Sequence, residues 1–158
     1  MFERFARAAP RIERLHRTER AAALAALHAA AFAQAWDAAT FETLILERGT
    51  VVQALVAGEA VAGLALSRVV LDEAEVLSVV VAAASRRAGH GGRLFGAHLG
   101  ALAAEGVRVV HLEVEEGNAP AFRLYERFGF GAVGRREGYY RRADGTRASA
   151  VTMSLELG

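Results

Sequence analysis

The sequence contains no cysteine and no lysine, and these two absences exclude several kinds of chemistry. Without cysteine, the chain has no disulfides, no thiolate metal ligands and no thiol nucleophile. Without lysine, all 19 basic residues are arginine, which excludes Schiff-base catalysis and a P-loop lysine. A chain without cysteine fits a reducing compartment, and we expect a cytoplasmic protein.

Proline is rare and the net charge is close to zero. The two prolines stand at positions 10 and 120, and no repeat or low-complexity linker divides the 158 residues. We therefore expect a single domain that covers residues 1–158. With 19 basic and 18 acidic residues, the formal net charge of +1 gives no general attraction to nucleic acid or to an anionic membrane. We expect neither as a partner.

The arginine-rich start of the chain does not resemble a targeting segment. It contains several glutamates, which transit peptides avoid, and no apolar signal core follows it. The longest apolar stretch, residues 21–36, is mostly alanine and is too short and too weakly apolar to span a bilayer. We interpret the arginines spaced from Arg4 to Arg20 as solvated surface residues.

The pattern of apolar residues predicts two helices near the start of the chain. Thr18 is a suitable N-cap for a helix that ends near Phe32, and Asp37 is one for a second helix that ends at Gly49. Further on, β-branched and apolar runs separated by turn residues predict strands. The expected strands are residues 50–57, 60–71, 75–81, 107–114, 131–141 and 147–157.

The segment of residues 75–114 has the order strand, glycine-rich loop, helix, strand. Its helix has apolar residues at helical spacing over residues 94–102. This order predicts a right-handed crossover between two parallel strands. A short helix follows, which we expect to begin after Asn118 and to end at Gly129. We therefore predict an α/β fold with a mixed, mostly antiparallel sheet, a central parallel β-α-β crossover and flanking helices.

The loop before the crossover helix has the sequence R-R-A-G-H-G-G at residues 86–92 and the features of a phosphate site. Glycines let the backbone approach a ligand closely, and the free amides and positive dipole end of a helix N-terminus attract an anion. Arg86 and Arg87 add positive charge. The loop lacks the G-K-S/T of nucleotide triphosphatases. A tight turn between strand and helix also uses glycine for steric reasons, so the loop alone leaves a ligand-free turn open.

A second segment, residues 112–130, completes a recognisable pattern. Together the two segments resemble the GCN5-related N-acetyltransferase (GNAT) superfamily, whose acetyl-CoA loop has the pattern Q/R-x-x-G-x-G/A. The following strand and helix of that superfamily have a pattern like LxVxxxNxxAxxLYxxxGF. The resemblance extends from about residue 73 to the end of the chain. The matching residues are Arg86, Gly89, Gly91, Leu112, Val114, Asn118, Ala121, Leu124, Tyr125, Gly129 and Phe130.

Within the superfamily, the sequence is most similar to the ribosomal-protein alanine N-acetyltransferases (RimI type). The similarity lies in Trp36 before a helix start, in LEVEEGN at residues 112–118, and in the tail RREGYYRRADGTRASAVTM. The tail is similar to the pattern R-R-x-x-Y-Y-x-x-x-D-G of that family. One position departs from it: Ser149 precedes Ala150, where the family tends to carry an acidic residue.

This resemblance implies acetyl-CoA as co-substrate, no metal, and a role for a defined set of residues. It implies that Glu113 is the proton acceptor and that Tyr125 is the proton donor. Residues 79–81 would offer strand amides to the acetyl group and the pantetheine. The implied cofactor-binding residues are Val79, Val80, Val81, Arg86, Arg87, Ala88, Gly89, His90, Gly91, Gly92 and Asn118.

The roles of Glu113 and Tyr125 can also be argued from chemistry. Acetyl transfer from a thioester to an amine needs a neutral amine, a polarised carbonyl and a proton for the departing thiolate. Glu113 lies near the C-terminal end of a strand, where open sheets place ligands. Without the resemblance, Glu113 also fits a solvated carboxylate, and Tyr125 also fits a packing residue. For the carbonyl oxygen, we expect an amide of residues 79–81 that a β-bulge leaves unpaired.

Other polar and aromatic residues carry weaker expectations. Tyr139 and Tyr140 either shape an acceptor pocket or simply alternate across a strand, and we expect one of them to line the pocket. Four histidines lack the spacing with carboxylates that a zinc site needs, so we expect no metal. They are His28, His90, His98 and His111.

The resemblance implies a protein N-terminal α-amine as the acceptor, specifically the N-terminal alanine of a ribosomal protein. An α-amine, with a pKa of about 7.7 to 8.0, needs less help from a base than a lysine, with a pKa of about 10.4. We also expect Glu113, Glu115 and Glu116 to attract a basic peptide. Two alternatives are a small-molecule amine N-acetyltransferase and a non-catalytic acyl-CoA-binding sensor, which would not need Glu113 and Tyr125.

Overall fold

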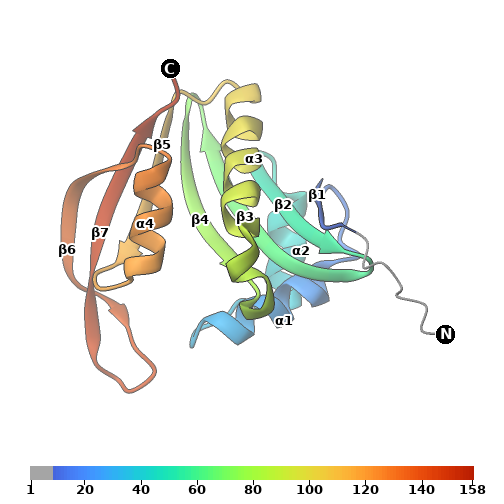
Figure 1. Cartoon of the computed structure of the whole chain (residues 1–158), viewed down its shortest axis with the longest axis horizontal. Helices are drawn as coiled ribbons and strands as arrows, with labels where there is room; N and C mark the ends of the chain where they lie inside the picture. Colours follow the sequence, from blue (N-terminus) through green and yellow to red (C-terminus); the bar gives the residue numbers. More distant parts are fainter. Residues whose placement is uncertain (1–8) are drawn as a thin grey trace.

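The computed structural model describes residues 9–158, except for the side chains of residues 87 and 88. Arg4 and Arg7, two of the arginines interpreted above as surface residues, lie outside the described residues. Within residues 9–158, no helix is long and apolar enough to cross a membrane. The elements in chain order are β1 (Arg11–Arg14), α1 (Ala21–Ala31), α2 (Ala38–Leu46), β2 (Thr50–Ala57), β3 (Ala60–Val70), β4 (Glu73–Val81), the 3-10 helix η1 (Ala83–Ala88), α3 (His90–Ala104), β5 (Val109–Glu115), α4 (Ala119–Arg127), β6 (Gly131–Arg141) and β7 (Arg147–Glu156), as Figure 1 shows.

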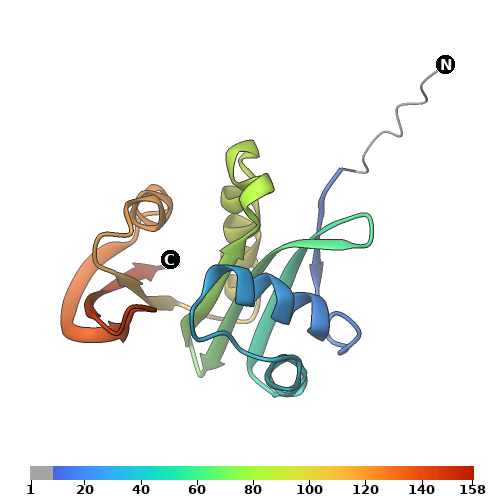
Figure 2. The same cartoon turned by 90° about the horizontal axis from the view of Figure 1, so that it is seen from below.

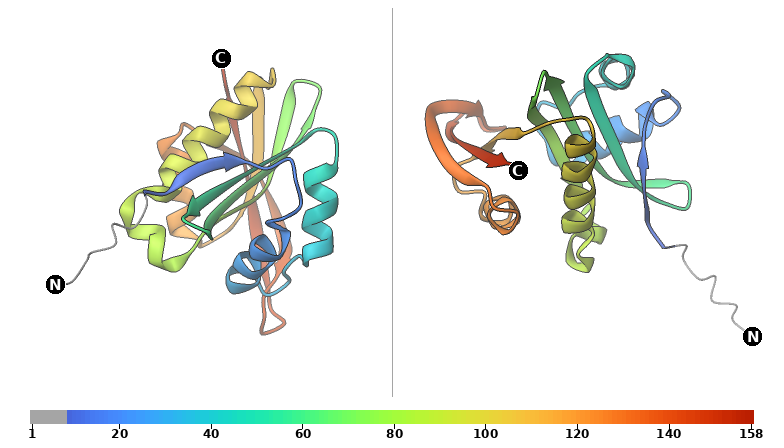
Figure 3. Two further views of the ribbon diagram at one scale, coloured as in Figure 1. Left: turned by 90° about the vertical axis from the view of Figure 1, so that its right-hand side faces the viewer. Right: turned by 90° about the horizontal axis from the view of Figure 1, so that it is seen from above.

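The strands form one sheet with the order β1-β2-β3-β4-β5-β7-β6. Neighbouring strands are antiparallel except β4 and β5, which are parallel and are connected through η1 and α3. Helices α3 and α4 cover one face of the sheet, and α1 and α2 cover the other (Figures 2 and 3). The predicted α/β fold with a central parallel crossover is confirmed.

Most predicted elements lie within a few residues of their expected bounds, but β1 and one helix cap differ. Strand β1 was not predicted because the sequence R-I-E-R has no strand-forming run; it forms by pairing with the edge of β2. The prediction that Thr18 caps α1 is wrong. Helix α1 begins after Arg20, and the backbone carbonyl of Thr18 accepts a hydrogen bond from the N–H of Ala21 at 3.0 Å. The Asp37 cap is confirmed, since its carboxylate accepts from the N–H of Thr40 at 2.8 Å.

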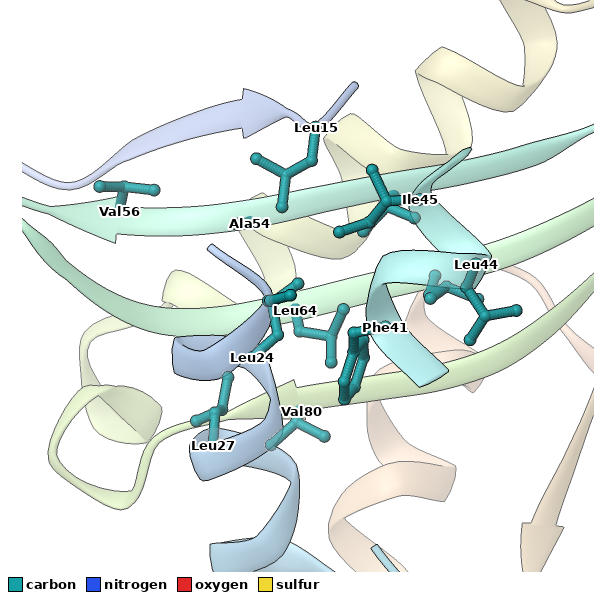
Figure 4. Close-up of a cluster of buried hydrophobic side chains, with 13 residues drawn as sticks. Leu15, Leu24, Leu27, Phe41, Leu44, Ile45, Ala54, Val56, Leu64 and Val80 are labelled. Atoms are coloured by element: carbon teal, nitrogen blue, oxygen red, sulfur yellow. The ribbon is translucent and has the colours of Figure 1, made fainter. Parts of the chain in front are cut away.

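Helices α1 and α2 are attached to the sheet by buried apolar side chains. Leu24 and Leu27 of α1 lie in one buried cluster with Phe41 of α2. The cluster also contains Leu64 and Val80 of the sheet, as Figure 4 shows. Full burial of one such side chain contributes about 1.5–3 kcal/mol. The cluster therefore fixes both helices on this face of the sheet.

On the other face, an aromatic cluster holds α4 against α3 and the sheet. The ring of Phe95 on α3 lies 5.3 Å from that of Tyr125 and 5.3 Å from that of Phe128, centroid to centroid. Phe130, which follows α4, lies 5.8 Å from Phe95. Edge-on and tilted aromatic pairs at these distances are favourable beyond their buried area. They fix the orientation of α4, and with it the position of Tyr125.

The parallel pair at the centre of the sheet is short. Residues 73–75 of β4 pair with residues 109–111 of β5, and the register ends there. Strand β4 also has a β-bulge: Val76 pairs with Ser67 and Ser78 pairs with Leu66, so Leu77 is an extra residue. A bulge bends its strand and increases its twist. Beyond residue 75, the edges of β4 and β5 that face each other share no ladder bonds among the described residues.

A buried polar group connects α3 to β2 and β3. The ring of His98 is fully buried, with Nδ1 2.8 Å from Oε1 of Gln53 and Nε2 2.6 Å from the hydroxyl of Ser67. Because the amide oxygen of Gln53 only accepts, Nδ1 of His98 is the donor, and Nε2 accepts from Ser67. Burial lowers the pKa of His98 to about 4, so the ring is neutral at neutral pH.

This buried imidazole makes stability depend on pH. In the unfolded chain His98 takes up a proton near its ordinary pKa of 6.5, whereas in the folded chain it does so only near 4. Stability is therefore lost as the pH falls from 6.5 toward 4. Compared with a His98→Gln variant, the wild type should lose about 2 kcal/mol more unfolding free energy between pH 7 and pH 4.5. Urea unfolding at the two pH values measures this, and equal losses in both proteins would contradict the neutral ring.

Candidate active site

The glycine-rich loop that was predicted to bind phosphate lies between β4 and α3. Gly89 has a left-handed backbone, with φ of +76°, and α3 begins at His90 without a side-chain cap. The first N–H groups of a helix have no partner within the helix. Together with the positive end of the helix dipole, they make this turn suited to a phosphate group.

Two glycines of the loop lie close to β4 and α4. A Cβ at Gly91 would lie 3.5 Å from Cγ2 of Val81, and one at Gly92 would lie 3.5 Å from a guanidinium nitrogen of Arg127. The loop therefore lies against the end of β4 and receives a cation from α4. Arg127 was missed in the sequence analysis, because only the packing of α4 brings it to the loop.

Two other loop residues have defined surroundings. The side chain of Arg86 donates from Nε to the backbone carbonyl of Val81 at 3.0 Å, which ties the loop to β4. Atom Nδ1 of His90 is buried and has no hydrogen-bond partner among the described residues. An unpartnered buried nitrogen at this turn fits a site that a polar ligand completes. Arg87 and Ala88 belong to η1, and their side chains lie outside the description.

Residues 79–81 lie on the part of β4 that β5 does not pair. The side chain of Val80 packs in the cluster under α1 and α2, whereas those of Val79 and Val81 pack against clusters that include α3 residues. Successive N–H groups of a strand point to opposite edges. At least one amide of residues 79–81 therefore faces the free edge. The β-bulge of β4 lies at Leu77 in its pairing with β3, two residues before the segment in which we expected a bulge.

Asn118 has a structural use that the sequence also predicted. Its side-chain oxygen accepts from the backbone N–H of Ala121 at 3.3 Å, which caps α4. The side-chain amide group is not used in this cap. It stays a candidate contact for the cofactor.

Glu113 projects from β5 on the face that carries α1 and α2. Its neighbours Leu112 and Val114 are buried in the cluster that contains Tyr125, and alternate side chains of a strand point to opposite faces. Atom Oε1 of Glu113 lies 3.1 Å from Nε of Arg136. Glu113 is therefore not the freely solvated carboxylate that the sequence left open.

Tyr125 lies on the opposite face of the sheet from Glu113. It belongs to α4 and is buried, and this burial raises the pKa of its phenol to about 12. The phenol therefore keeps its proton throughout the neutral range. Since one group lies on each face, a substrate can contact both only where β4 and β5 are not paired.

Tyr140 also belongs to this site. Its hydroxyl donates to the backbone carbonyl of Glu113 at 3.2 Å, and partial burial, followed by the nearby Glu113 carboxylate, raises its pKa to about 12. The irregular register of β6 and β7 places it there, since Arg136 pairs with Ala150 but Tyr140 with Ala148. Of the two tyrosines considered, the structure brings Tyr140 to Glu113.

Ser149 contacts the irregular part of the β6–β7 register. It lies between the two paired positions of β7, and its hydroxyl accepts from the N–H of Gly138 at 3.4 Å. Gly138 has φ of +59°, in the left-handed region that favours glycine. The residue that departs from the family pattern thus contacts the bulge that positions Tyr140.

The expectation of an open acidic patch is wrong. Each of the three carboxylates is paired with an arginine of β6 or of the following turn. Glu113 pairs with Arg136 at 3.1 Å, Glu115 with Arg142 at 3.0 Å, and Glu116 with Arg135 at 2.8 Å. The hairpin folds back beside β5 and brings these cations, which the local sequence did not indicate. The carboxylates therefore offer a basic peptide no free negative charge.

The described residues contain no group of three or more His, Asp or Glu side chains that could hold a metal ion. Of the four histidines, His98 is in the buried network, and His28 accepts from the N–H of Trp36 at Nδ1, at 3.0 Å. His111 lies 3.3 Å from Glu73 on the surface.

Comparisons with known proteins agree with this geometry. The model of the acetyltransferase (GNAT) family matches residues 12–130. A relative from Haemophilus influenzae, named ribosomal protein bS18 alanine N-acetyltransferase, is 35% identical over 103 residues, which are 65% of this chain and 70% of the relative. The relative of the same name from Escherichia coli K12 is 38% identical over 96 residues, 61% of this chain and 64% of the relative, so the match spans just under two thirds of it.

Two solved structures extend the likeness over nearly the whole fold. The crystal structure of the ribosomal-protein-S18-alanine N-acetyltransferase from Escherichia coli is 31% identical, with a TM-score of 0.86 and coverage of 94% of each chain. Arabidopsis thaliana NAA60 in complex with acetyl-CoA is 20% identical, with a TM-score of 0.83, and the match covers 94% of this chain and 98% of that one. At 20% identity, the likeness to NAA60 shows the fold alone. Since the family model covers most of the sheet and both halves of the site, the chain belongs to the acetyltransferase (GNAT) family and is an N-acetyltransferase.

Proposed function

We propose that this chain transfers the acetyl group of acetyl-CoA directly to the N-terminal α-amine of a protein, with the N-terminal alanine of a ribosomal protein as the acceptor. The placement of Glu113 and Tyr125 on opposite faces of the sheet, beside the unpaired edges of β4 and β5, carries the proposal. The bacterial relatives named for the alanine of bS18 support the acceptor. The NAA60 complex, a related fold with acetyl-CoA, supports the donor.

The residues around the glycine loop fit coenzyme A. The N–H groups at the start of α3 would hold the pyrophosphate, and Arg127 would add a positive charge beside it. The free edge of β4 would pair with the pantetheine amides as an added strand does. One amide of residues 79–81 would polarise the carbonyl oxygen. Bound there, acetyl-CoA supplies an acetyl group already activated as a thioester.

Glu113 would act as the base for the amine. An N-terminal ammonium must lose a proton before its nitrogen can attack the carbonyl carbon. The carboxylate of Glu113 is mostly enclosed, with 18% of its side chain exposed, and lies on the α1/α2 face. It would accept this proton directly or through one water and pass it to solvent after the reaction.

Tyr125 would assist the departing sulfur. As the new C–N bond forms and the C–S bond breaks, negative charge develops on the sulfur, and the phenol donates a hydrogen bond to it. A phenol with a pKa of about 12 is a weaker acid than a thiol with a pKa of about 8.5. Transfer of the phenol proton to the sulfur is therefore unfavourable on its own. It is completed because the nitrogen loses its second proton as the amide forms, and that proton restores the neutral phenol.

The proposal includes a cytoplasmic location and one N-acetyltransferase domain over residues 1–158. The absence of cysteine fits a reducing compartment. One continuous sheet from β1 to β7 supports a single domain.

A small-molecule amine is the second candidate acceptor. The observation that favours it is the pairing of Glu113, Glu115 and Glu116 with arginines, which neutralises these three carboxylates and weakens their attraction for a basic peptide. The presence of both Glu113 and Tyr125 at the site favours catalysis over a sensor that only binds acyl-CoA.

The acceptor is tested with a peptide that begins with alanine and contains an internal lysine. We expect acetylation of the α-amine alone, because the α-amine has the lower pKa and needs less help from Glu113. Fragmentation by mass spectrometry locates the label, and a panel of polyamines provides the comparison. Labelling of the lysine, or turnover of the polyamines alone, would refute the proposed acceptor.

The cofactor site is tested with Gly91→Trp. The indole would occupy the space between the loop and Val81, so the affinity for CoA should fall at least about tenfold, a change of 1.4 kcal/mol in binding free energy. The matched control is Gly100→Trp on the same helix, at an exposed position where a Cβ meets nothing within 4 Å. Calorimetric titration with CoA gives both values. Equal affinities in two folded variants would place the cofactor elsewhere.

The acid and base roles are tested with Glu113→Gln and Tyr125→Phe. Each should lower kcat by about 10²- to 10⁴-fold and leave the CoA affinity nearly unchanged, because the protons move only during the reaction. Glu115→Gln is the control, since Glu115 lies on the same strand and is also paired with an arginine. Full turnover in both variants between pH 6 and 9 would rule out these roles.

A further inference from the structure

We propose that Arg136 occupies the carboxylate of Glu113 in the absence of an acceptor and that the ammonium group of the acceptor displaces it. Arg136 would then be a positioning residue that sets the affinity of the enzyme for its amine. This inference rests on the proposed function, in which Glu113 receives the amine.

The ion pair has an enclosed side and an open side. Nε of Arg136 lies 3.1 Å from Oε1 of Glu113, with 60% of the arginine side chain exposed but only 18% of the glutamate side chain. Both groups lie on the same face, because Arg136 and Glu115 both pair with Ala150 and Glu113 alternates with the buried Leu112 and Val114. The guanidinium therefore stands on the solvent side of the carboxylate.

An incoming ammonium needs the same partner. Like the guanidinium, it is a cationic N–H donor that bonds to a carboxylate oxygen at about 2.7–2.9 Å. Two cations at one mostly enclosed carboxylate repel each other. Acceptor binding therefore favours the state in which Arg136 has moved away.

Tyr139 provides a second contact for the guanidinium of Arg136. The guanidinium carbon of Arg136 lies 5.1 Å from the centre of the Tyr139 ring, within the range of a cation–π contact. Tyr139 packs edge-on against Tyr140, with ring centroids 5.3 Å apart, and Tyr140 is held by its bond to the carbonyl of Glu113. When the ion pair breaks, the contact with Tyr139 can persist, so the displacement does not need a change in the fold.

The neighbouring arginine provides a matched control. Arg135 pairs with Glu116 and Glu137 and projects to the other face of β6, since it lies one position along the strand. Among the described residues, it makes no ion pair with Glu113. Removal of either arginine changes the net charge by the same amount, so general electrostatic effects on the peptide are equal.

The experiment compares Arg136→Gln with Arg135→Gln, using the alanine peptide. Loss of the competing cation should lower the KM for the peptide about two- to fivefold in Arg136→Gln, as expected for a partly exposed ion pair, with kcat within about twofold of the wild type. Arg135→Gln should leave both constants unchanged, and Arg136→Lys should restore the higher KM. Calorimetric titration of the peptide into the CoA complex should show the same gain in affinity without turnover.

The outcomes separate this inference from the function on which it rests. An unchanged or raised KM in Arg136→Gln, while Glu113→Gln still abolishes turnover, overturns the role of Arg136 and leaves the proposed function intact. An equal decrease of KM in Arg136→Gln and Arg135→Gln would show that only the net charge matters, and it also overturns the role of Arg136. A wild type that acetylates no amine overturns the proposed function, and this inference with it.

Discussion

The site depends on the short backbone pairing between β4 and β5. They pair only over residues 73–75 and 109–111, but each remains paired on its outer side, β4 with β3 as far as Val81 and β5 with β7 as far as Glu115. The sheet can therefore open at its centre without loss of its outer ladders. The N–H and C=O groups of an unpaired strand edge can form hydrogen bonds with another chain or with a ligand. In this fold the unpaired edges of β4 and β5 are available to a ligand, and they lie beside the glycine loop, α3 and α4.

Much of the fold follows from local sequence, and the parts that do not are long-range. The β-α-β unit could be predicted because the run EVLSVVV, the glycines at 89, 91 and 92 and the apolar residues of α3 each specify their element locally. Strand β1 could not, since its four residues form a strand only by pairing with β2. Similarly, motif spacing indicated Glu113 and Tyr125, whereas Arg127 and Arg136 reach the site through the packing of α4 and the irregular register of β6.

The exclusive use of arginine affects how the last hairpin is held. Arg135, Arg136 and Arg142 each reach a carboxylate at the end of β5 or in the turn after it. A guanidinium offers several donors in a fixed plane, so it orders the groups that it joins more than an ammonium does. Exposed pairs of this kind add little stability individually. Together they connect β6 and the turn after it to the end of β5, near Glu113.

In the proposed reaction, the placement of Glu113 and Tyr125 on opposite faces of the sheet has a kinetic consequence. The glycine loop and Tyr125 lie on the α3/α4 face, and Glu113 lies on the α1/α2 face. Acetyl-CoA would then approach from one face and the amine from the other, so neither would have to leave before the other arrives. Both must be present at once for the atoms to meet through the sheet, which gives a ternary complex. The two products can then depart in opposite directions, and neither blocks the exit of the other.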